Sequence, residues 1–327
     1  MAKTIDGYKR APSGVVVPEK ETILANRIAP NPGKYHPHSI NGESELKLAE
    51  FCWGNQKAML MRGPPGCGKT TFAMWFAKEK GAGFYRVVCN EDTTTASFFG
   101  KLVPAGDEFR VDWGPVCEAA AAGKAVVLID DVNLADKRVT ASLYSALDYR
   151  VLKDEVSGMT FEIPKDVMLM FAMNTGSLYT TVETSPALTR RMGVEMEFDH
   201  LPKERCVEMI LERLEKAKEP KVELQKRKIA EGLWDGTDEL RKAYNMGGMV
   251  KEKDADTGAA RNVNLPFKEV PGDGLILNVM QQIVAGIDAK VAVMTGMVYQ
   301  VMSDFAKDAI QKARAAAEVV YNKIPMP

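Results

Sequence analysis

The sequence has little of what builds a disulfide framework or a structural zinc site. Its five cysteines are odd in number and include no C-x-x-C pair, and only three histidines occur in 327 residues. Paired cysteines at short spacing are the usual mark of both kinds of site. The cysteines are Cys52, Cys67, Cys89, Cys117 and Cys206. We therefore expect reduced thiols and a cytoplasmic location.

The sequence also lacks a long apolar run and an excess of charge of either sign. No stretch approaches about 18 uninterrupted apolar residues, and the first residues, MAKTIDGYKRAPSG, lack the apolar core of a signal peptide. Lysine and arginine number 43 and aspartate and glutamate 44, which gives a formal net charge of -1. Such a chain has no overall positive field to attract nucleic acid or anionic lipid. We expect no membrane partner, and the charge argues against nucleic acid.

What the sequence does have is the length and composition of a two-domain globular protein. Its 327 residues are 46% hydrophobic and 27% charged, which is typical of globular chains. Residues 1–42 are rich in proline, glycine and lysine and show little periodicity, so we interpret them as an N-terminal arm. Residues 43–218 alternate helical patterns with apolar runs, and residues 219–327 have the pattern of a smaller helical domain with an inserted loop.

Five apolar runs in residues 43–218 have the pattern of buried parallel strands. Most are apolar at consecutive positions, as strands covered on both faces of a sheet are. The runs cover residues 58–61, 84–88, 125–129, 167–172 and 194–198. Helical patterns between them, including 71–80 and 203–218, complete βα units. The sequence therefore predicts an α/β fold with a central parallel sheet flanked by helices.

The first run leads into a glycine-rich loop, GPPGCGKT, at residues 63–70. This is a full G-x-x-x-x-G-K-[ST] match between a predicted strand and a predicted helix, which is the context in which the motif binds nucleotide phosphates. The glycines let successive backbone N–H groups face the phosphates. Lys69 is expected to reach the β- and γ-phosphates, and the Thr70 hydroxyl to bind Mg²⁺. The predicted nucleotide-binding residues are Gly63, Pro64, Pro65, Gly66, Cys67, Gly68, Lys69, Thr70 and Thr71.

Two acids and an amide follow later apolar runs. Asp130 ends the third run, where Mg²⁺ bound beside the loop needs a carboxylate partner. Asp131 comes next and is expected to polarise the attacking water. Asn174 ends the fourth run, and its amide can hold that water against the γ-phosphate without adding charge. We expect Lys69, Asp131 and Asn174 to be catalytic.

A pair of arginines, Arg190 and Arg191, precedes the fifth run. Arginines near a helix end can simply favour the helix dipole. The alternative is that Arg191, or Arg190 in second place, reaches across a subunit interface to a neighbour's γ-phosphate, as arginine fingers do. We favour this alternative chiefly because of the family resemblance given next.

These motifs, in this order, resemble a known family. GPPGCGKT, AVVLIDDVNLAD, FAMNTG and SPALTRRM are similar to the AAA+ ATPases of the MoxR class, and most of all to its CbbQ, NorQ and GvpN-like branch. The resemblance covers residues 43–215 well and 275–305 weakly. It implies a P-loop NTPase fold with a C-terminal helical lid, ATP and Mg²⁺ as cofactors, and ATP hydrolysis. It also implies a ring, usually a hexamer, that remodels a client protein, often one with a von Willebrand A domain.

The resemblance also implies two working hairpins. One is an insert around residues 98–113, followed by a helix that resembles the family's W-x-x-G-P-L pattern. The other covers residues 151–161, with Ser157-Gly158 near its turn. Phe98, Phe99 and Phe109 could contact substrate in a pore, although local packing is the commoner role of such aromatics.

The chain departs from the family pattern at two points. Where the family usually carries Glu after the Walker B aspartate, this chain has Asp131, one methylene shorter, so we expect slow hydrolysis. In the lid, Gly274 and Leu275 occupy the stretch where the family's sensor 2 arginine should fall. Arg261 is the nearby candidate for that role.

Three other functions remain as alternatives. A nucleic-acid motor is conceivable because related rings translocate DNA, but the neutral charge and the absence of an evident stacking platform argue against it. A nucleotide-gated scaffold that binds ATP with slow turnover stays open as an alternative because of Asp131. A small-molecule kinase is disfavoured by Asn174 and Arg191.

Overall fold

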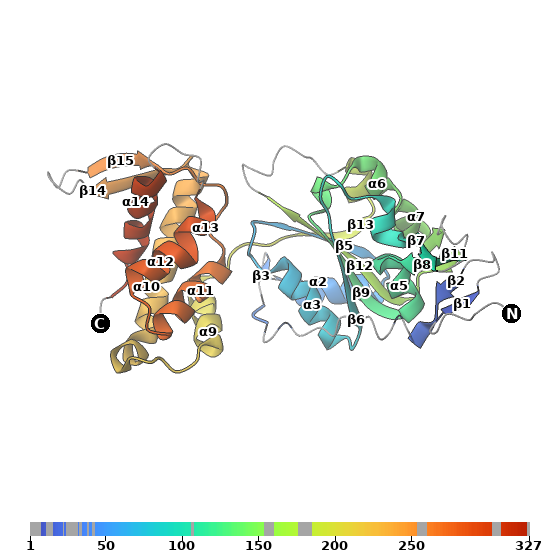
Figure 1. The fold of residues 1–327 in the computed structure, drawn as a ribbon, viewed down its shortest axis with the longest axis horizontal. Helices are drawn as coiled ribbons and strands as arrows, with labels where there is room; N and C mark the ends of the chain where they lie inside the picture. The colour runs from blue at the N-terminus through green and yellow to red at the C-terminus, as the bar shows by residue number, and fades with distance from the viewer. Residues whose placement is uncertain are drawn as a thin grey trace. The chain divides into compact units, whose positions relative to one another are not determined.

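The computed structural model describes residues 8–10, 16–21, 23, 32, 35–37, 39–40, 43–105, 108–153, 160–175, 185–253, 260–302 and 309–325. Internal contacts divide the chain into two compact units, which Figure 1 labels by element. The first unit comprises Met1–Gly63, Gly68–Asn174 and Thr181–Phe198, and the second comprises Pro64–Cys67, Thr175–Thr180 and Asp199–Pro327.

The first unit is built on a five-stranded sheet in which every neighbouring pair is parallel. Each of the five predicted apolar runs forms one of its strands, so the predicted α/β fold is confirmed. In sheet order the strands are β13 (Met192–Glu197), β5 (Ala58–Gly63), β12 (Asp166–Asn174), β9 (Lys124–Asp130) and β6 (Gly83–Val88). The carboxyl ends of β5, β9 and β12, where ligands bind to such sheets, carry Gly63, Asp130 and Asn174.

Both faces of the three inner strands are buried, which explains why their sequences are apolar at consecutive positions. Leu60, Ile129 and Phe171 join one core cluster with α5 (Pro115–Ala122). Their neighbours on the opposite face, such as Leu128 and Met170, are equally buried. Helices α2 (Glu45–Gly54) and α3 (Lys69–Glu79) also pack on the sheet.

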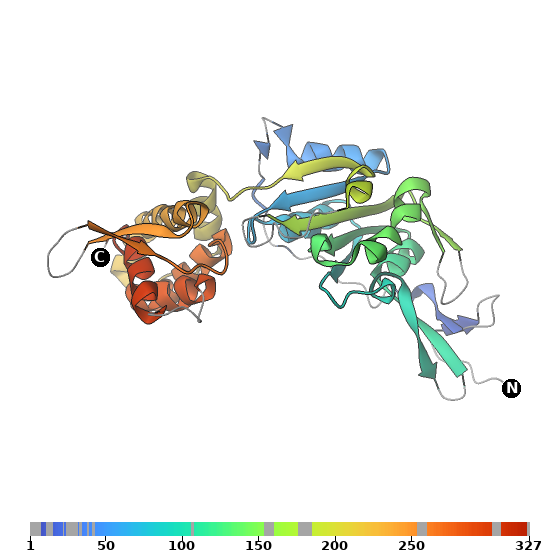
Figure 2. The ribbon, with the colours of Figure 1, turned by 90° about the horizontal axis from the view of Figure 1, so that it is seen from above.

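A second, four-stranded sheet joins the predicted insert to the N-terminal arm. The short helix α4 (Thr95–Phe99) leads into an antiparallel hairpin of β7 (Gly100–Ala105) and β8 (Glu108–Trp113). Strand β2 (Val16–Pro18) pairs in parallel with β8, and β1 (Tyr8–Arg10) pairs with β2. Figure 2 shows this hairpin projecting from the central sheet with the N-terminal strands beside it. The arm is therefore partly a pair of strands, because the edge of β8 offers backbone groups that β2 can satisfy.

The remaining elements of the first unit are short. After β9 come the 3₁₀ turn η1 (Val132–Leu134), α6 (Lys137–Ala141) and α7 (Tyr144–Tyr149). The second predicted hairpin is present as β10 (Val151–Lys153) paired with β11 (Thr160–Glu162), while Ser157 and Gly158 lie outside the described residues. Short α8 (Pro186–Thr189) precedes β13, and β3 (Ser39–Ile40) pairs with β4 (Glu43–Ser44) before α2.

The second unit is mainly helical and begins earlier than the sequence predicts. We expected the boundary at residues 218 and 219, but contacts assign the chain from Asp199 to this unit. The reason is α9 (Lys203–Arg213), whose apolar face, including Val207 and Ile210, is buried in the helical core. The other helical elements are α10 (Pro220–Asn245), α11 (Asp273–Val284), α12 (Ala289–Val293), the π-helical turn η2 (Met294–Val298), α13 (Tyr299–Val301) and α14 (Ala309–Tyr321).

The stretch after α10 that we interpreted as an inserted loop contains a hairpin. Strands β14 (Met249–Lys253) and β15 (Ala260–Asn264) pair antiparallel. The charged residues of MVKEK hide the strand from an apolar pattern, and residues 254–259 between the two strands lie outside the described residues. The long helix α10 packs closely on α14, since a Cβ at Gly236 would lie 2.5 Å from the Val320 Cα.

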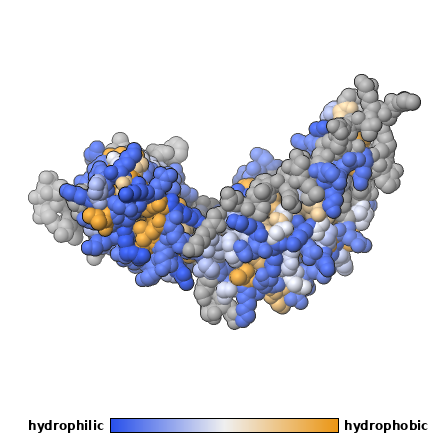
Figure 3. All heavy atoms as spheres, turned by 90° about the horizontal axis from the view of Figure 1, so that it is seen from below, coloured by the Kyte–Doolittle hydropathy of each residue, from blue (hydrophilic) through white to orange (hydrophobic). Residues whose placement is uncertain are grey.

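Polar groups cover most of the face shown in Figure 3, with apolar groups exposed in small clusters. Among the described residues, no helix is both long and apolar enough to cross a bilayer.

Candidate nucleotide site

The glycine-rich loop joins the end of β5 to the start of α3, as the motif predicts. Gly66 has φ +74° and Gly68 has φ +97°, values in the left-handed region that favours glycine. Gly68 is also the N-cap of α3. The first N–H groups of a helix have no partner within the helix. The loop therefore has the backbone shape that a phosphate-binding turn requires.

Lys69 and Asn174, which come from distant parts of the chain, meet beside this loop. The Lys69 side chain is buried, and its Nζ donates to the Gly63 carbonyl oxygen at 2.9 Å and to Asn174 Oδ1 at 3.0 Å. They meet because β12 lies beside β5 in the sheet, with Asn174 opposite Gly63. The ammonium group is thus held at the mouth of the loop.

Thr70 and Asp130, the predicted magnesium ligands, are also in contact. Thr70 Oγ1 donates to Asp130 Oδ2 at 3.0 Å, and Asp130 is 5% exposed. A hydroxyl beside a carboxylate is the hard oxygen set that Mg²⁺ prefers, and this ion usually takes one or two protein ligands together with substrate phosphates. Within the described residues no three His, Cys, Asp or Glu side chains gather to form a complete metal cage. The donor set therefore fits a magnesium ion that arrives with a nucleotide.

Arg86 is a member of this group that the sequence analysis missed. Its Nη2 donates to Asp130 Oδ2 at 2.6 Å and its Nε at 3.1 Å. Val88 of β6 lies opposite Asp130 of β9, so Arg86 is the diagonal neighbour of Asp130 on the same face, a position that a long side chain can span. The available signal was a single charge inside an otherwise apolar run, FYRVV.

Asp131 is brought to the same place by an unusual backbone conformation. Its φ of 54° and ψ of 39° are left-handed, which few non-glycine residues adopt. Asn174 Nδ2 donates to Asp131 Oδ1 at 2.7 Å, so the Asn174 amide joins Lys69 to Asp131. Burial and the negative charge of Asp130 raise the pKa of Asp131, while Lys69 and Arg86 act against the rise.

Arg191 and Arg190 lie outside this cluster. Arg191 Nε donates to Asp148 Oδ2 at 2.8 Å, and its Nη1 donates to the Ala187 carbonyl oxygen at 2.6 Å. The guanidinium carbon lies 4.1 Å from the centre of the Tyr144 ring, a cation–π distance. Arg190 is exposed at the end of α8. The recorded partners of Arg191 come from α7 and α8, and not from the loop that holds Lys69.

Comparison with known proteins shows which proteins these motifs are similar to. Residues 58–192 match the model of the AAA domain of the dynein-related subfamily. This stretch of the chain is therefore similar to the AAA domains of AAA+ ATPases. Its curated relatives include the protein NorQ of Paracoccus denitrificans, 32% identical over 175 residues, which are 53% of this chain and 64% of NorQ. The relatives named here are members of the MoxR class, so the expected resemblance is confirmed.

Two other relatives extend the comparison. CbbQ of Hydrogenophilus thermoluteolus is 30% identical over 159 residues, which are 48% of this chain and 58% of CbbQ. The denitrification regulatory protein NirQ of Pseudomonas aeruginosa is 29% identical over 157 residues, which are 48% of this chain and 60% of NirQ. The chain thus spans about three fifths of the length of the curated relatives it matches.

The aromatic residues of the insert do not form one exposed group. Phe98 is fully buried and Phe99 is 9% exposed, whereas Phe109 at the hairpin is 59% exposed. Phe98 and Phe99 pack edge to face, with ring centroids 6.1 Å apart. Phe98 and Phe99 thus have the commoner role of local packing and not the alternative pore role, because both rings belong to the core of the first unit. Phe109 alone of the three is free to contact another molecule.

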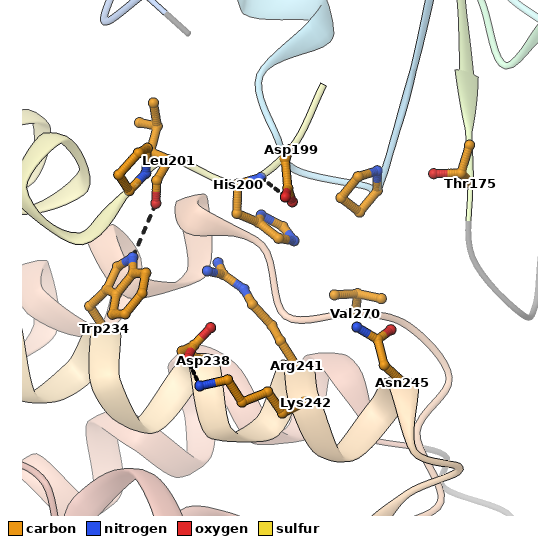
Figure 4. Close-up of a pocket in the computed structure, with 12 residues that line it drawn as sticks. Thr175, Asp199, His200, Leu201, Trp234, Asp238, Arg241, Lys242, Asn245 and Val270 are labelled. Carbon is orange, nitrogen blue, oxygen red and sulfur yellow. Dashed lines mark hydrogen bonds and ion pairs between the residues drawn. The ribbon is translucent and has the colours of Figure 1, made fainter. Parts of the chain in front are cut away.

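In the helical unit, a pocket is lined in part by Trp234 and Arg241 of α10 (Figure 4). Arg241 is 5% exposed, and its Nη2 donates to Asp273 Oδ1 at 2.6 Å. His200 Nδ1 lies 3.7 Å from Asp273 Oδ2, an electrostatic rather than a hydrogen-bonding distance.

Arg261, our sensor 2 candidate, lies on β15, and its side chain is outside the described residues.

Proposed function

We propose that this chain binds ATP with Mg²⁺ at the loop of residues 63–70 and hydrolyses it. The observation that carries the proposal is the convergence of Lys69, Asp131 and Asn174 with the Thr70–Asp130 pair at the ends of neighbouring strands. Residues separated by up to 105 positions in the chain meet there, and each has the chemistry that one step of hydrolysis needs. The match of residues 58–192 to the AAA domain supports the same conclusion.

The backbone of the loop and Lys69 bind and orient the phosphates in this proposal. Lys69 exchanges its bonds to Gly63 and Asn174 for bonds to the β- and γ-phosphate oxygens, since an ammonium prefers an anionic acceptor. Thr70 and Asp130 hold the magnesium ion, which supplies positive charge to the phosphate oxygens when bound. Once Lys69 turns to the phosphates, Asn174 Oδ1 is available to accept a hydrogen bond from a water molecule.

Asp131 acts as the base. A water molecule held by Asn174 attacks the γ-phosphorus, the bond from that phosphorus to the β–γ bridging oxygen breaks, and ADP and inorganic phosphate leave. The proton of the water passes to the Asp131 carboxylate. The raised pKa of Asp131 makes its carboxylate a better proton acceptor near neutral pH than an ordinary aspartate. Its side chain is one methylene shorter than Glu, so we propose that turnover is slow.

We further propose that the chain assembles as a ring, usually hexameric in this class, in which Arg191 of one subunit reaches the γ-phosphate bound by the next. The Asp148 and Tyr144 contacts hold Arg191 away from the site of its own chain. Such a ring remodels a client protein in the cytoplasm, with a von Willebrand A domain as the expected client module. All five cysteines are buried, and none is in a disulfide, which is consistent with a reducing compartment.

A nucleotide-gated scaffold is the second candidate, and Asp131 is the observation that favours it. Steady-state release of phosphate by the wild type, Asp131→Glu and Lys69→Ala separates the two. The ATPase proposal expects wild-type turnover at least about tenfold above Lys69→Ala, since Lys69 stabilises charge in the transition state. Wild-type turnover equal to that of Lys69→Ala, with a much faster Asp131→Glu, would support the scaffold. A Lys69→Ala pull-down would then test for a retained client.

A further inference from the structure

The carboxylate of Asp130, a predicted magnesium ligand, contacts both the other predicted ligand, Thr70, and the guanidinium of Arg86. Asp130 Oδ2 accepts from Thr70 Oγ1 at 3.0 Å, and from Arg86 Nη2 at 2.6 Å and Nε at 3.1 Å. The other carboxylate oxygen, Oδ1, accepts from the backbone N–H of Asp131 at 3.2 Å. Arg86 therefore contacts the same carboxylate of Asp130 that a metal ion would bind.

The charge balance explains why a cation is needed there. Asp130 is 5% exposed and Asp131 lies beside it, so two carboxylates share a partly dry site in which an uncompensated charge is strongly unfavourable. Lys69 donates to Gly63 and to Asn174. The forked contact of Arg86 supplies positive charge directly to Asp130, and a charged donor makes such bonds short and strong.

Arg86 also has freedom to leave, which a purely structural arginine lacks. Its side chain is 40% exposed, whereas that of Asp130 is 7% exposed. It extends from β6, the edge strand of the sheet, so one side of that strand has no neighbouring strand in the central sheet. The guanidinium can therefore move toward solvent without opening the core.

We propose that Arg86 is a resident counter-ion of the magnesium site. It neutralises Asp130 while the site holds no metal and is displaced from Asp130 Oδ2 when Mg²⁺ arrives with nucleotide. The affinity for Mg²⁺ is then set by an exchange of one cation for another, and it is weaker than Thr70 and Asp130 alone would give. The inference rests on the proposed nucleotide function and assigns a positioning and regulatory role to Arg86 within that site.

The test compares the wild type with Arg86→Gln, Arg86→Lys and the control Arg138→Gln. Arg138 is also an arginine paired with a nearby aspartate, Asp136, but its side chain is 93% exposed on α6. Binding of ADP is measured by calorimetry over a series of Mg²⁺ concentrations at fixed neutral pH and ionic strength. Because ADP is not hydrolysed, the readout is independent of turnover. The melting temperature of each variant is measured in EDTA and in Mg²⁺ with ADP.

Removing the competing charge is expected to lower the Mg²⁺ concentration for half-maximal enhancement of ADP binding by about tenfold. Arg86→Gln should also melt several degrees below the wild type in EDTA, because Asp130 loses its partner, and Mg²⁺ with ADP should restore most of the difference. Arg86→Lys keeps the charge with fewer directed donors, so it should lie between the two. Arg138→Gln should match the wild type.

An unchanged or higher Mg²⁺ requirement in folded Arg86→Gln would overturn the inference, since it would show that Arg86 does not compete with the metal. If Arg86→Gln does not fold, the decision passes to Arg86→Lys, for which a wild-type Mg²⁺ dependence overturns the inference. Failure of the wild type itself to bind ADP with Mg²⁺ would instead refute the proposed function, so the two failures are distinguishable.

Discussion

Asn174 is the central residue of the proposed catalytic group. Its amide accepts from Lys69 and donates to Asp131, so it links the phosphate-binding side of the site to the base. The sequence predicts this group because Lys69, Asp130 and Asn174 each end or follow an apolar run, and the carboxyl ends of parallel strands share one edge of the sheet. It does not predict Arg86, because the pairing of β6 with β9 that carries its side chain to Asp130 is a long-range feature.

The pH dependence of hydrolysis follows from the raised pKa of Asp131. Only the ionised carboxylate can accept a proton, so the turnover number should rise with pH. Burial and the charge of Asp130 move its midpoint above the ordinary aspartate value of about 3.9. A pH–rate profile of phosphate release checks this, with Asp131→Asn expected to lose about 10²-fold or more in turnover. A profile that stays flat down to pH 4, or a fully active Asp131→Asn, would exclude Asp131 as the base.

The cysteines should be inert in the folded chain. Burial raises the pKa of Cys52 to about 11. Burial, with the charges of Asp131 and Asp130, raises that of Cys89 to about 12. Because the thiolate is the reactive form, iodoacetamide at pH 8 should leave both unlabelled until the protein is denatured, as mass spectrometry of the peptides can show. Rapid labelling of Cys89 in native protein would mean that the carboxylates of Asp130 and Asp131 are farther away or less buried than described.

Among the elements, the strands of the central sheet are predictable and the added strands are not. β5, β9 and β12 are buried on both faces, so their sequences are continuous apolar runs. Strands β14 and β15 carry charged residues, and β2 has only three residues. Their pairing depends on partners distant in sequence or on a turn, and local apolar periodicity contains neither.

The contact between α10 and α11 in the second unit should depend on one buried ion pair. Arg241 and Asp273 have side chains 6% exposed and are 2.6 Å apart. Arg241→Met should lower the free energy of unfolding of this unit by about 3–5 kcal/mol, because Asp273 would remain buried without its cation. The matched control is Lys242→Met, whose side chain is 68% exposed and pairs with Asp238, and which should leave the stability close to that of the wild type.

Urea unfolding followed by fluorescence and circular dichroism measures these differences, and equal midpoints for Arg241→Met and the wild type would contradict the account.

Burial raises the pKa of Asp273, but His200, Arg241 and the Leu201 amide together outweigh it and leave the pKa lowered. A lowered pKa contributes stability that is present above the unfolded value of about 3.9 and is lost as pH falls through the folded value. The difference between wild type and Arg241→Met should therefore shrink below about pH 4.

At the scale of the whole molecule, each active site of the proposed ring contains residues of two neighbouring chains. Arg191→Ala and Lys69→Ala should each be nearly inactive alone, because one lacks the finger and the other the phosphate ligand. Mixing them should restore activity, since random assembly pairs an intact Lys69 with an intact neighbouring Arg191 at roughly a quarter of interfaces. Phosphate release before and after mixing checks this. No recovery from two variants that each still assemble would show that Arg191 does not act between subunits.

The measurement that tests the central claim most directly is calorimetric titration of the folded wild-type chain with ATP or GTP, with and without Mg²⁺, beside Lys69→Ala. The account predicts saturable binding that Mg²⁺ strengthens and that Lys69→Ala weakens, because Thr70, Asp130 and Lys69 form one site. Well-folded wild-type protein that binds neither nucleotide in the presence of Mg²⁺ would contradict it.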